Sequence, residues 1–343
     1  MQQKIKINTD SKEPVYKQVI KAIEELVQKG EYKEGDSIPS MTELADELQI
    51  SRETIKNSFS ILRKRGLIET TPGKGYFITS QSTSKLKILL IFDKISYYKY
   101  AMYTAFSDVI GNLSEISIRL HNQDIEVFEK FIEESLDRYD YYVLTSHFPL
   151  VPEIQRRAIK AIKRIPNRKL ILIDHFLKDL KGNFGVVYQD YEKDIYDGLL
   201  QGIESLRKYK KFNIISMPGS LYAPYLQKGI REFCTKNEIN YEIYNGLNPE
   251  VIKRDEVFLI LNGQLDKELI EISEVATSMG YKIGEDIGLI SYNESPINKI
   301  ILNGLTVLST DFEQMGELAA KMILEKSFKK VKCDFRLIRR STF

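Results

Sequence analysis

Apolar positions in the first eighty residues are spaced as they are on the inner faces of helices. Apolar side chains recur three to four residues apart in three successive stretches, and this spacing predicts amphipathic helices. The predicted helices cover about residues 14–29, 40–48 and 51–65. Ser40 with Glu43 has the sequence of a capping box, Ser51 can cap the third helix, and Gly66 ends it. The short connection between the second and third helices predicts a helix-turn-helix.

Two short β-prone runs follow these helices. They cover residues 67–71 and 76–79, and Pro72-Gly73-Lys74-Gly75 between them is typical of a hairpin turn. The third helix has two faces, with Ile55, Phe59 and Leu62 inward and Arg52, Lys56, Ser60 and Arg63 outward. Helix, turn, helix and hairpin together predict a winged DNA-binding module.

Charge supports DNA binding over one part of this module only. Residues 51–76 carry six basic side chains against two acidic ones, whereas residues 10–50 carry five basic against ten acidic. A surface that faces phosphates needs such a concentration of cations. Alternatively, the run Arg63-Lys64-Arg65 is only a solvated helix end, where cations are favourable in any protein. The helix-turn-helix and the wing favour the DNA-binding interpretation.

A polar linker at 80–85 separates this module, residues 1–79, from residues 86–343. Beyond the linker, continuous apolar runs alternate with helical stretches, and such runs are typical of strands buried on both faces of a parallel sheet. The strand-like runs are 88–92, 116–120, 141–145, 170–173, 186–188, 212–217, 241–244, 257–261 and 287–291. The helical stretches are 98–113, 125–136, 154–162, 191–206, 225–237 and 265–279. These units exceed one sheet, so we expect an α/β domain of two doubly wound lobes.

Composition narrows the class of protein. The 343 residues, 43% of them hydrophobic, suffice for two domains, and a net charge of +2 argues against a surface that binds polyanions everywhere. Cys234 and Cys333 form no CxxC pair and only three histidines occur, which argues against a metal site or a disulfide framework. We find no glycine-rich phosphate loop, signal peptide or membrane-spanning run, and expect a cytoplasmic protein without cofactors.

The N-terminal motifs resemble the GntR family of bacterial transcription factors. The matching residues are Pro14, Tyr16 and Gln18, then Gly35-Asp36, Ile38-Pro39-Ser40, Leu44-Ala45, Ile50-Ser51-Arg52, Thr54-Ile55, Gly66-Leu67-Ile68, Gly73 and Gly75. The resemblance implies that Arg52, Thr54 and Lys56 face the major groove, with Gly73 and Lys74 near the minor groove. The predicted DNA-binding residues are Ser40, Thr42, Ser51, Arg52, Thr54, Lys56, Arg63, Gly73, Lys74 and Gly75. Thr42 and Lys56 stand where arginine is usual, and Glu53 where a small polar residue is common.

The second part of the chain is similar to the LacI-type effector domain, which shares its fold with periplasmic sugar-binding proteins. The matching strings are Asp190-Tyr191 with Gly198 and Gly202, Leu261-Asn262-Gly263-Gln264, Gly280-Tyr281, Ile283 to Asn293, Leu305-Thr306-Val307 and Met315 to Ala320. A GntR-type reader joined to this domain resembles regulators of the arabinose-repressor type. That resemblance implies a monosaccharide effector, similar to arabinose or fucose.

Polar residues at the predicted strand ends are the candidate ligand contacts. Ligands of open α/β sheets bind outside the carboxyl ends of the strands, and carboxylates, amides and aromatic faces suit a polyhydroxylated ring. The candidates are Asp93, Tyr97, Ser146, His147, Asp174, His175, Gln189, Asp190, Tyr222, Asn262, Gln264 and Asn293. Alternatively, Asp190 only caps the following helix, His147 and His175 are ordinary loop histidines, and the tyrosines belong to a core or an interface.

These features favour a cytoplasmic, sugar-responsive repressor that binds operator DNA as a homodimer. An enzyme is an alternative, since paired Asp and His residues can serve acid–base catalysis, although we find no nucleophile elbow, metal cluster or phosphate loop. A regulator that senses a metabolite other than a sugar is another. A transport-type binding protein predicts a secretion signal and no DNA module, neither of which the sequence shows.

Overall fold

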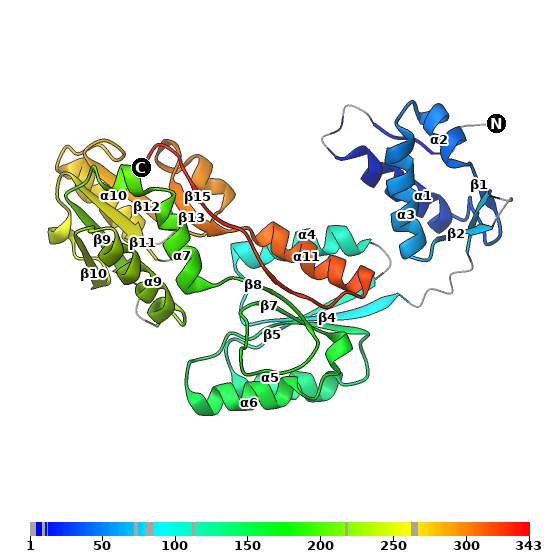
Figure 1. Cartoon of the computed structure of the whole chain (residues 1–343), viewed down its shortest axis with the longest axis horizontal. Helices are drawn as coiled ribbons and strands as arrows, with labels where there is room; N and C mark the ends of the chain where they lie inside the picture. Colours follow the sequence, from blue (N-terminus) through cyan, green and yellow to red (C-terminus); the bar gives the residue numbers. More distant parts are fainter. Residues whose placement is uncertain are drawn as a thin grey trace. The chain divides into compact units, whose positions relative to one another are not determined.

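The computed structural model describes residues 5–8, 11, 13–71, 75–79, 85–111, 114–216, 219–261 and 267–343. The chain divides near Leu86 into two compact units, and Figure 1 colours them along the sequence. Within the described residues, none of the helices combines the length and the apolar character that crossing a bilayer requires.

The N-terminal unit is a winged helix-turn-helix. Its elements are α1 (Val15–Gln28), β1 (Ser37–Ile38), α2 (Met41–Leu48), α3 (Arg52–Lys64), β2 (Ile68–Thr71) and β3 (Gly75–Ile78). The antiparallel sheet has the order β1-β3-β2. The sequence predicts β2 and β3 but not β1, because two residues are too short to show a periodicity. The wing tip, residues 72–74, lies outside the described residues.

Local sequence accounts for the placement of α2 and α3. The capping box is present: Ser40 Oγ accepts from Glu43 N at 3.2 Å, and Ser40 N donates to Glu43 Oε2 at 2.8 Å. Ser51 Oγ accepts from Thr54 N at 3.1 Å at the start of α3. The apolar faces of α1, α2 and α3 meet in one buried core, formed by residues such as Val19, Ile23, Leu44, Ile55, Phe59 and Leu62.

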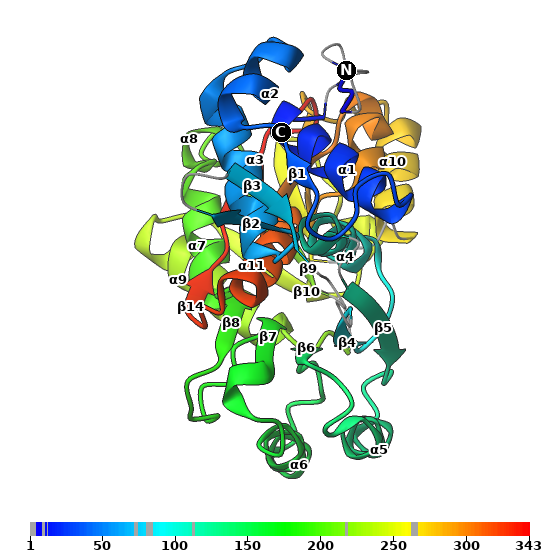
Figure 2. The ribbon, with the colours of Figure 1, turned by 90° about the vertical axis from the view of Figure 1, so that its right-hand side faces the viewer.

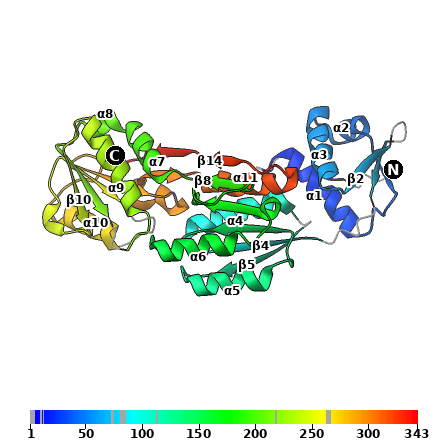
Figure 3. The same ribbon diagram turned by 60° about the horizontal axis from the view of Figure 1, so that its bottom comes forward.

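The C-terminal unit consists of two α/β lobes. The first lobe contains β4 (Leu86–Phe92), α4 (Tyr97–Ile110), β5 (Ser114–Leu120), α5 (Ile125–Ser135), β6 (Tyr141–Thr145), α6 (Pro152–Ile162), β7 (Leu170–Asp174), β8 (Gly185–Tyr188), α11 (Phe312–Glu325) and β14 (Lys330–Lys332). Its sheet has the order β14-β8-β7-β6-β4-β5. Helices α5 and α6 cover one face of the sheet, and α4 and α11 cover the other (Figures 1 and 3). Figure 2 shows α5 and α6 nearly end-on beside this sheet.

The second lobe repeats this arrangement. It contains α7 (Tyr191–Leu200), α8 (Ile203–Leu206), β9 (Lys211–Ser216), α9 (Ala223–Lys236), β10 (Tyr241–Asn245), β11 (Glu256–Ile260), α10 (Lys267–Ser278), β12 (Ile287–Tyr292), β13 (Thr306–Thr310) and β15 (Phe335–Ile338). The sheet order is β10-β9-β11-β12-β13-β15, with α7 and α9 packed on one face and α10 on the other.

Two features of this unit differ from the sequence prediction. The predicted helix 191–206 is two helices, α7 and α8, separated at Gly202, whose Cβ would lie 2.9 Å from Leu337. Strand β15 pairs antiparallel with β13, whereas the other described pairs of both lobes are parallel. The prediction of a two-lobed domain with parallel sheets is confirmed, and the antiparallel edge strand is an addition to it.

The chain passes between the two lobes three times. It crosses from β8 to α7, from β13 to α11 and from β14 to β15. Backbone hydrogen bonds join the crossing segments: Cys333 N donates to Tyr188 O at 2.8 Å, and Asp311 N donates to Asp334 O at 2.9 Å. The first lobe is thereby completed by α11 and β14, which come from the end of the chain. Close packing of α11 on α4 requires Gly316, because a Cβ there would lie 2.1 Å from Met102 O.

Candidate functional site

The outer face of α3 is the first candidate site. Arg52, Lys56, Ser60 and Arg63 are exposed, while Ile55, Phe59 and Leu62 are buried, as the helical spacing predicts. Of the other predicted DNA-binding residues, Thr42 and Ser51 are exposed and Ser40 is half-buried in the capping box. Gly75 opens β3 with a φ of 95°, and Gly73 and Lys74 lie outside the described residues.

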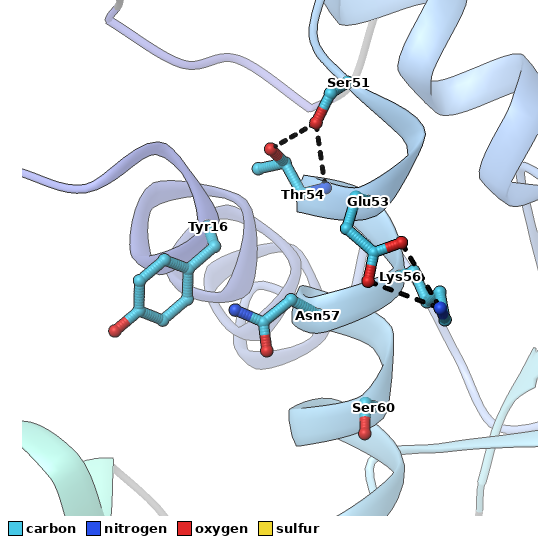
Figure 4. A pocket seen from close by; sticks show the side chains of 7 residues that line it. All are labelled: Tyr16, Ser51, Glu53, Thr54, Lys56, Asn57 and Ser60. Atoms are coloured by element: carbon cyan, nitrogen blue, oxygen red, sulfur yellow. Dashed lines mark hydrogen bonds and ion pairs between the residues drawn. The ribbon is translucent and has the colours of Figure 1, made fainter.

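A recess of about 470 Å³ lies beside the beginning of α3. Its lining residues are Tyr16 from α1 and Ser51, Glu53, Thr54, Lys56, Asn57 and Ser60. Figure 4 shows the Asn57 amide turned toward the Tyr16 ring, with Glu53 and Lys56 joined on the other side of the helix. The Lys56 ammonium lies 3.2 and 3.3 Å from the two carboxylate oxygens of Glu53. The beginning of α3 therefore presents amide, hydroxyl, carboxylate and ammonium groups to solvent.

Arg65 does not belong to this outer face. Its guanidinium lies 2.5 Å from the Glu24 carboxylate, and the two side chains are only 8% and 7% exposed. Arg65 thus links the end of α3 to α1 inside the unit. The run Arg63-Lys64-Arg65 is therefore not solvated along its whole length, because the Arg65 side chain is buried. Counting all three charges overstates the positive charge on the outer face of α3.

A cavity of about 370 Å³ between the two lobes is the second candidate site. Parallel strands of the first lobe place Asp93, His147, Asp174 and Gln189 at one edge, because these residues follow or end β4, β6, β7 and β8. The second lobe contributes residues around the start of α9 and the end of β12. The further lining residues are Lys94, Tyr98, Gln123, Tyr191, Gly219, Ser220, Leu221, Tyr222, Leu226, Leu261, Tyr292, Asn293 and Phe312.

Two buried carboxylates, Asp93 and Asp174, line this cleft, and a buried lysine pairs with one of them. Lys99 is 1% exposed and forms an ion pair with Asp93. His147 lies between the two carboxylates, with Nε2 3.2 Å from Asp174 Oδ2 and Nδ1 3.4 Å from Asp93 Oδ1. Burial lowers the pKa of His147 to about 3, so the imidazole is neutral near pH 7. Burial also lowers the pKa of Lys99, to about 8, against the opposing attraction of Asp174.

Asp174 is held by neighbouring side chains. Its Oδ1 accepts from the Tyr191 hydroxyl at 3.1 Å and from the Gln189 amide. The Gln189 side chain also accepts from Thr310 Oγ1 at 2.9 Å, which joins the cleft to a crossing segment. Such a network positions the carboxylate rigidly, because each partner restricts its rotation.

Aromatic rings and two unpaired polar atoms line the opposite side. The Tyr222 ring stacks on Tyr191 with centroids 4.2 Å apart and meets the His147 ring edge-on at 5.0 Å. Within the part of the chain that the structure describes, the buried Tyr292 hydroxyl and Asn293 Oδ1 have no hydrogen-bond partner. A hydroxyl and an amide oxygen beside aromatic faces can bind the hydroxyls and the apolar face of a small polar ring.

The predicted ligand residues fall into several places. Asp93, His147, Asp174, Gln189, Tyr222 and Asn293 line the cleft together. Tyr97 lines an adjoining cavity of about 570 Å³, which shares Tyr292 and Asn293 with the cleft. His175 and Asp190 line another of about 510 Å³ that shares Gln189 and Tyr191, and Asp190 Oδ1 also caps α7 by accepting from Lys193 N at 3.4 Å. Ser146 is buried and lines none of these three cavities, and Asn262 and Gln264 lie outside the described residues.

Lys99 is the main residue that the sequence interpretation missed. It occupies the buried stripe of α4 with Met102, Phe106 and Ile110, at the spacing of an inward helix face. A lysine at an inward position of an apolar stripe is the signal that points to a buried ion pair. Tyr191, Tyr292 and Phe312 were also missed, and their separation along the chain carries no local signal.

Two families of known proteins match different parts of the chain. Residues 15–78 match the gntR family of bacterial regulatory proteins, and residues 222–332 match the periplasmic binding protein-like domain. The transcriptional repressor YtrA of Bacillus subtilis (strain 168) is 35% identical over 82 residues, which cover 24% of this chain and 63% of that protein. The Glc operon transcriptional activator of Escherichia coli (strain K12) is 35% identical over 65 residues, which cover 19% of this chain and 26% of that protein.

Solved structures resemble most of the chain in fold. A dimeric lac repressor with a C-terminal deletion has a TM-score of 0.59 at 15% identity and covers 75% of this chain and 98% of its own. A probable maltose operon transcriptional repressor from Staphylococcus has a TM-score of 0.58 at 16% identity and covers 77% and 99%. The sequence-based prediction of both family resemblances is confirmed. The chain carries a gntR-family helix-turn-helix domain followed by a periplasmic binding protein-like domain with the two-lobed fold of the lac repressor.

Proposed function

We propose that this protein is a transcriptional repressor whose binding to operator DNA is controlled by a small molecule in the interlobe cleft. The observation that carries the proposal is the presence, in one chain, of an exposed polar and basic helix face and a cavity lined by buried carboxylates and tyrosines. The matched relatives are named as transcription regulators, which supports the same class.

In the proposed complex, α3 enters the major groove and the wing lies against the neighbouring backbone. Arg52, Thr54 and Lys56 are the residues nearest to the bases, and Arg63 contacts phosphate. The exposure of Arg52, Lys56 and Arg63 on one side of α3 supports these roles. A phosphate contact contributes to affinity for every sequence, whereas a base contact discriminates between sequences.

The proposed effector is a neutral monosaccharide. The resemblance to regulators of the arabinose-repressor type suggests a sugar similar to arabinose or fucose. A cavity of about 370 Å³ is at the small end of the range of roughly 300–1,000 Å³ that ligand pockets span. The unpaired Tyr292 hydroxyl and Asn293 Oδ1 would bind sugar hydroxyls, and Tyr222 would cover the apolar face of the ring. A small metabolite of another class is the alternative effector.

We further propose that the repressor acts in the cytoplasm as a homodimer. Several large apolar side chains near the cavity that Tyr97 lines are exposed, which supports contact with a second copy: Ile95, Tyr97, Tyr100, Ile297 and Ile300. The similar lac repressor structure is a dimer. Because this patch includes residues of both lobes, a change in the angle between the lobes would change how two copies pair. Two copies would read a two-fold symmetric operator. To release the dimer from DNA, the effector need bind the DNA-bound arrangement of the dimer only about 10–100-fold less tightly than the free arrangement.

The test is a binding titration of the full chain. The operator is first selected from random duplex DNA, and its affinity is then measured by fluorescence anisotropy with and without each of a panel of pentoses and hexoses. A selected operator and at least one monosaccharide that weakens binding about tenfold or more support the proposal. Failure to select any duplex refutes the DNA-binding role, and selection without any response to monosaccharides refutes the effector class. Analysis of each sugar after incubation tests the enzymatic alternative, which predicts turnover.

A further inference from the structure

Glu53 is the only acidic residue of α3, and it lies at the end of the helix that would enter the groove. Its side chain is 77% exposed. A carboxylate near DNA phosphates is repelled, so at this position it weakens binding unless it meets a hydrogen-bond donor on a base.

Helix stability alone gives a weak reason for this glutamate. Ser51 already caps α3 through the Thr54 amide, and an acidic residue in the first turn contributes only about 0.3–1 kcal/mol. The ion pair with Lys56 is exposed on both sides, with 65% of the lysine side chain accessible, and such pairs contribute little. The pair therefore contributes little to the stability of α3.

The geometry of the Glu53–Lys56 pair suits a contact with bases. The Lys56 ammonium lies 3.2 and 3.3 Å from the Glu53 oxygens, so an acceptor and a donor are held side by side (Figure 4). In the major groove, a C·G base pair presents the cytosine N4 donor directly beside the guanine O6 and N7 acceptors. These two patterns are complementary.

We infer that Glu53 and Lys56 act together to read one G·C base pair in each half-site. Glu53 accepts from the cytosine amino group, and Lys56 donates to guanine O6 or N7. This inference rests on the proposed DNA-binding function and deepens it, because it names the base pair that the helix requires.

An A·T pair fits the same two side chains less well. Adenine also presents an amino donor, but its N7 acceptor lies next to that amino group and repels a carboxylate. Thymine presents a single O4 acceptor next to its methyl group, so the ammonium has fewer acceptors and less space than at guanine. The order of preference is therefore C·G first, with A·T a poor substitute.

The experiment compares base preferences of full-length variants by selection from random duplexes, followed by titration of single-substitution operators. Glu53→Gln and Lys56→Gln are the test variants. Glu25→Gln is the matched control, because Glu25 forms an exposed ion pair with Lys29 on α1 and lines no part of the recess. Thermal melting of each variant establishes that it is folded.

The wild-type chain and Glu25→Gln are expected to require one G·C pair per half-site, with about tenfold or greater loss when that pair becomes A·T. Glu53→Gln and Lys56→Gln are both expected to reduce that discrimination at the same position, by about fivefold or more. The double variant should lose no more than either single variant, because the two side chains read one pair.

Two outcomes would overturn the inference and are distinguishable from a failure of the proposed function. If Glu53→Gln binds all duplexes more tightly with unchanged base preferences, the carboxylate only repels phosphate. If the two variants relax discrimination at different base pairs, the residues do not act as a unit. If the wild-type chain selects no duplex at all, the proposed function and this inference fail together.

Discussion

The ion pair between Glu24 and Arg65 offers a measurement of what holds α3 on α1. Replacing Glu24 by alanine leaves the Arg65 guanidinium buried without its carboxylate, since its side chain is 8% exposed and lies 2.5 Å from Glu24. Removing one partner of a buried pair typically costs about 3–5 kcal/mol. The adjacent residue provides the control: Glu25 pairs with Lys29 at 3.9 Å, and both side chains are largely exposed. Glu25→Ala should therefore cost less than about 1 kcal/mol.

Hydrogen exchange in increasing urea measures this difference within the full chain. Peptides from α1 and α3 report the free energy of opening of the N-terminal unit, independently of the two lobes. A double variant, Glu24→Leu with Arg65→Met, removes both charges and should be more stable than Glu24→Ala alone. Equal destabilisation by Glu24→Ala and Glu25→Ala, or no recovery in the double variant, would refute the assignment of the pair as a buried link.

Three further perturbations test the C-terminal unit by urea unfolding. Gly316→Ala should lower stability by about 1–3 kcal/mol, because its Cβ would lie 2.1 Å from Met102 O; an unchanged midpoint would contradict the close packing. Lys99→Met should lower the free energy of unfolding by about 3–5 kcal/mol, because it leaves the Asp93 carboxylate buried without its ion-pair partner. The matched change at the exposed Lys94, Lys94→Met, should have little effect, and equal effects of the two variants would contradict the ion pair. Burial lowers the pKa of His121 to about 4 from 6.5, so the unfolded chain binds a proton first and this residue lowers stability by about 3 kcal/mol as pH drops from 6.5 to 4. Burial lowers the pKa of His147 and His175 as well, so His121→Phe should reduce the total decline without abolishing it, and an identical pH profile would refute the role of His121.

Sequence periodicity predicts the elements of this protein well because most of them bury one continuous face. The capping box at Ser40 and the apolar stripe of Ile55, Phe59 and Leu62 act within a single turn or helix, so local sequence is sufficient. Strand β1 was missed because two residues show no period. The antiparallel pairing of β15 was missed because it depends on which edge of the second sheet the chain returns to.

Side-chain roles in the sites were harder to predict, for an equally physical reason. The spacing of Arg65 does not tell whether its charge meets solvent or a carboxylate, and Glu24 is 41 residues away. The same holds for Lys99, whose inward position is visible in the stripe of α4 but whose partnership with Asp93 needs the folded loop after β4. Strand ends could be predicted because parallel strands bring their carboxyl ends to one edge, and six of the twelve predicted ligand residues line the cleft there.

Gln189 connects the cleft to the segments that join the lobes. Its amide nitrogen donates to Asp174 in the cleft, and its carbonyl oxygen accepts from Thr310 Oγ1, which begins the crossing into α11. In the proposed function, a ligand hydroxyl that donates to Asp174 would compete with the Gln189 amide nitrogen for this carboxylate and would free the amide to turn. Gln189 itself lies in the crossing from β8 to α7, and the adjacent Tyr188 O accepts from Cys333 N in the crossing from β14 to β15, so all three crossings meet around this residue. Under the proposed function, Gln189 is therefore the side chain through which effector binding would change the angle between the lobes, provided that the effector contacts the two lobe arrangements differently.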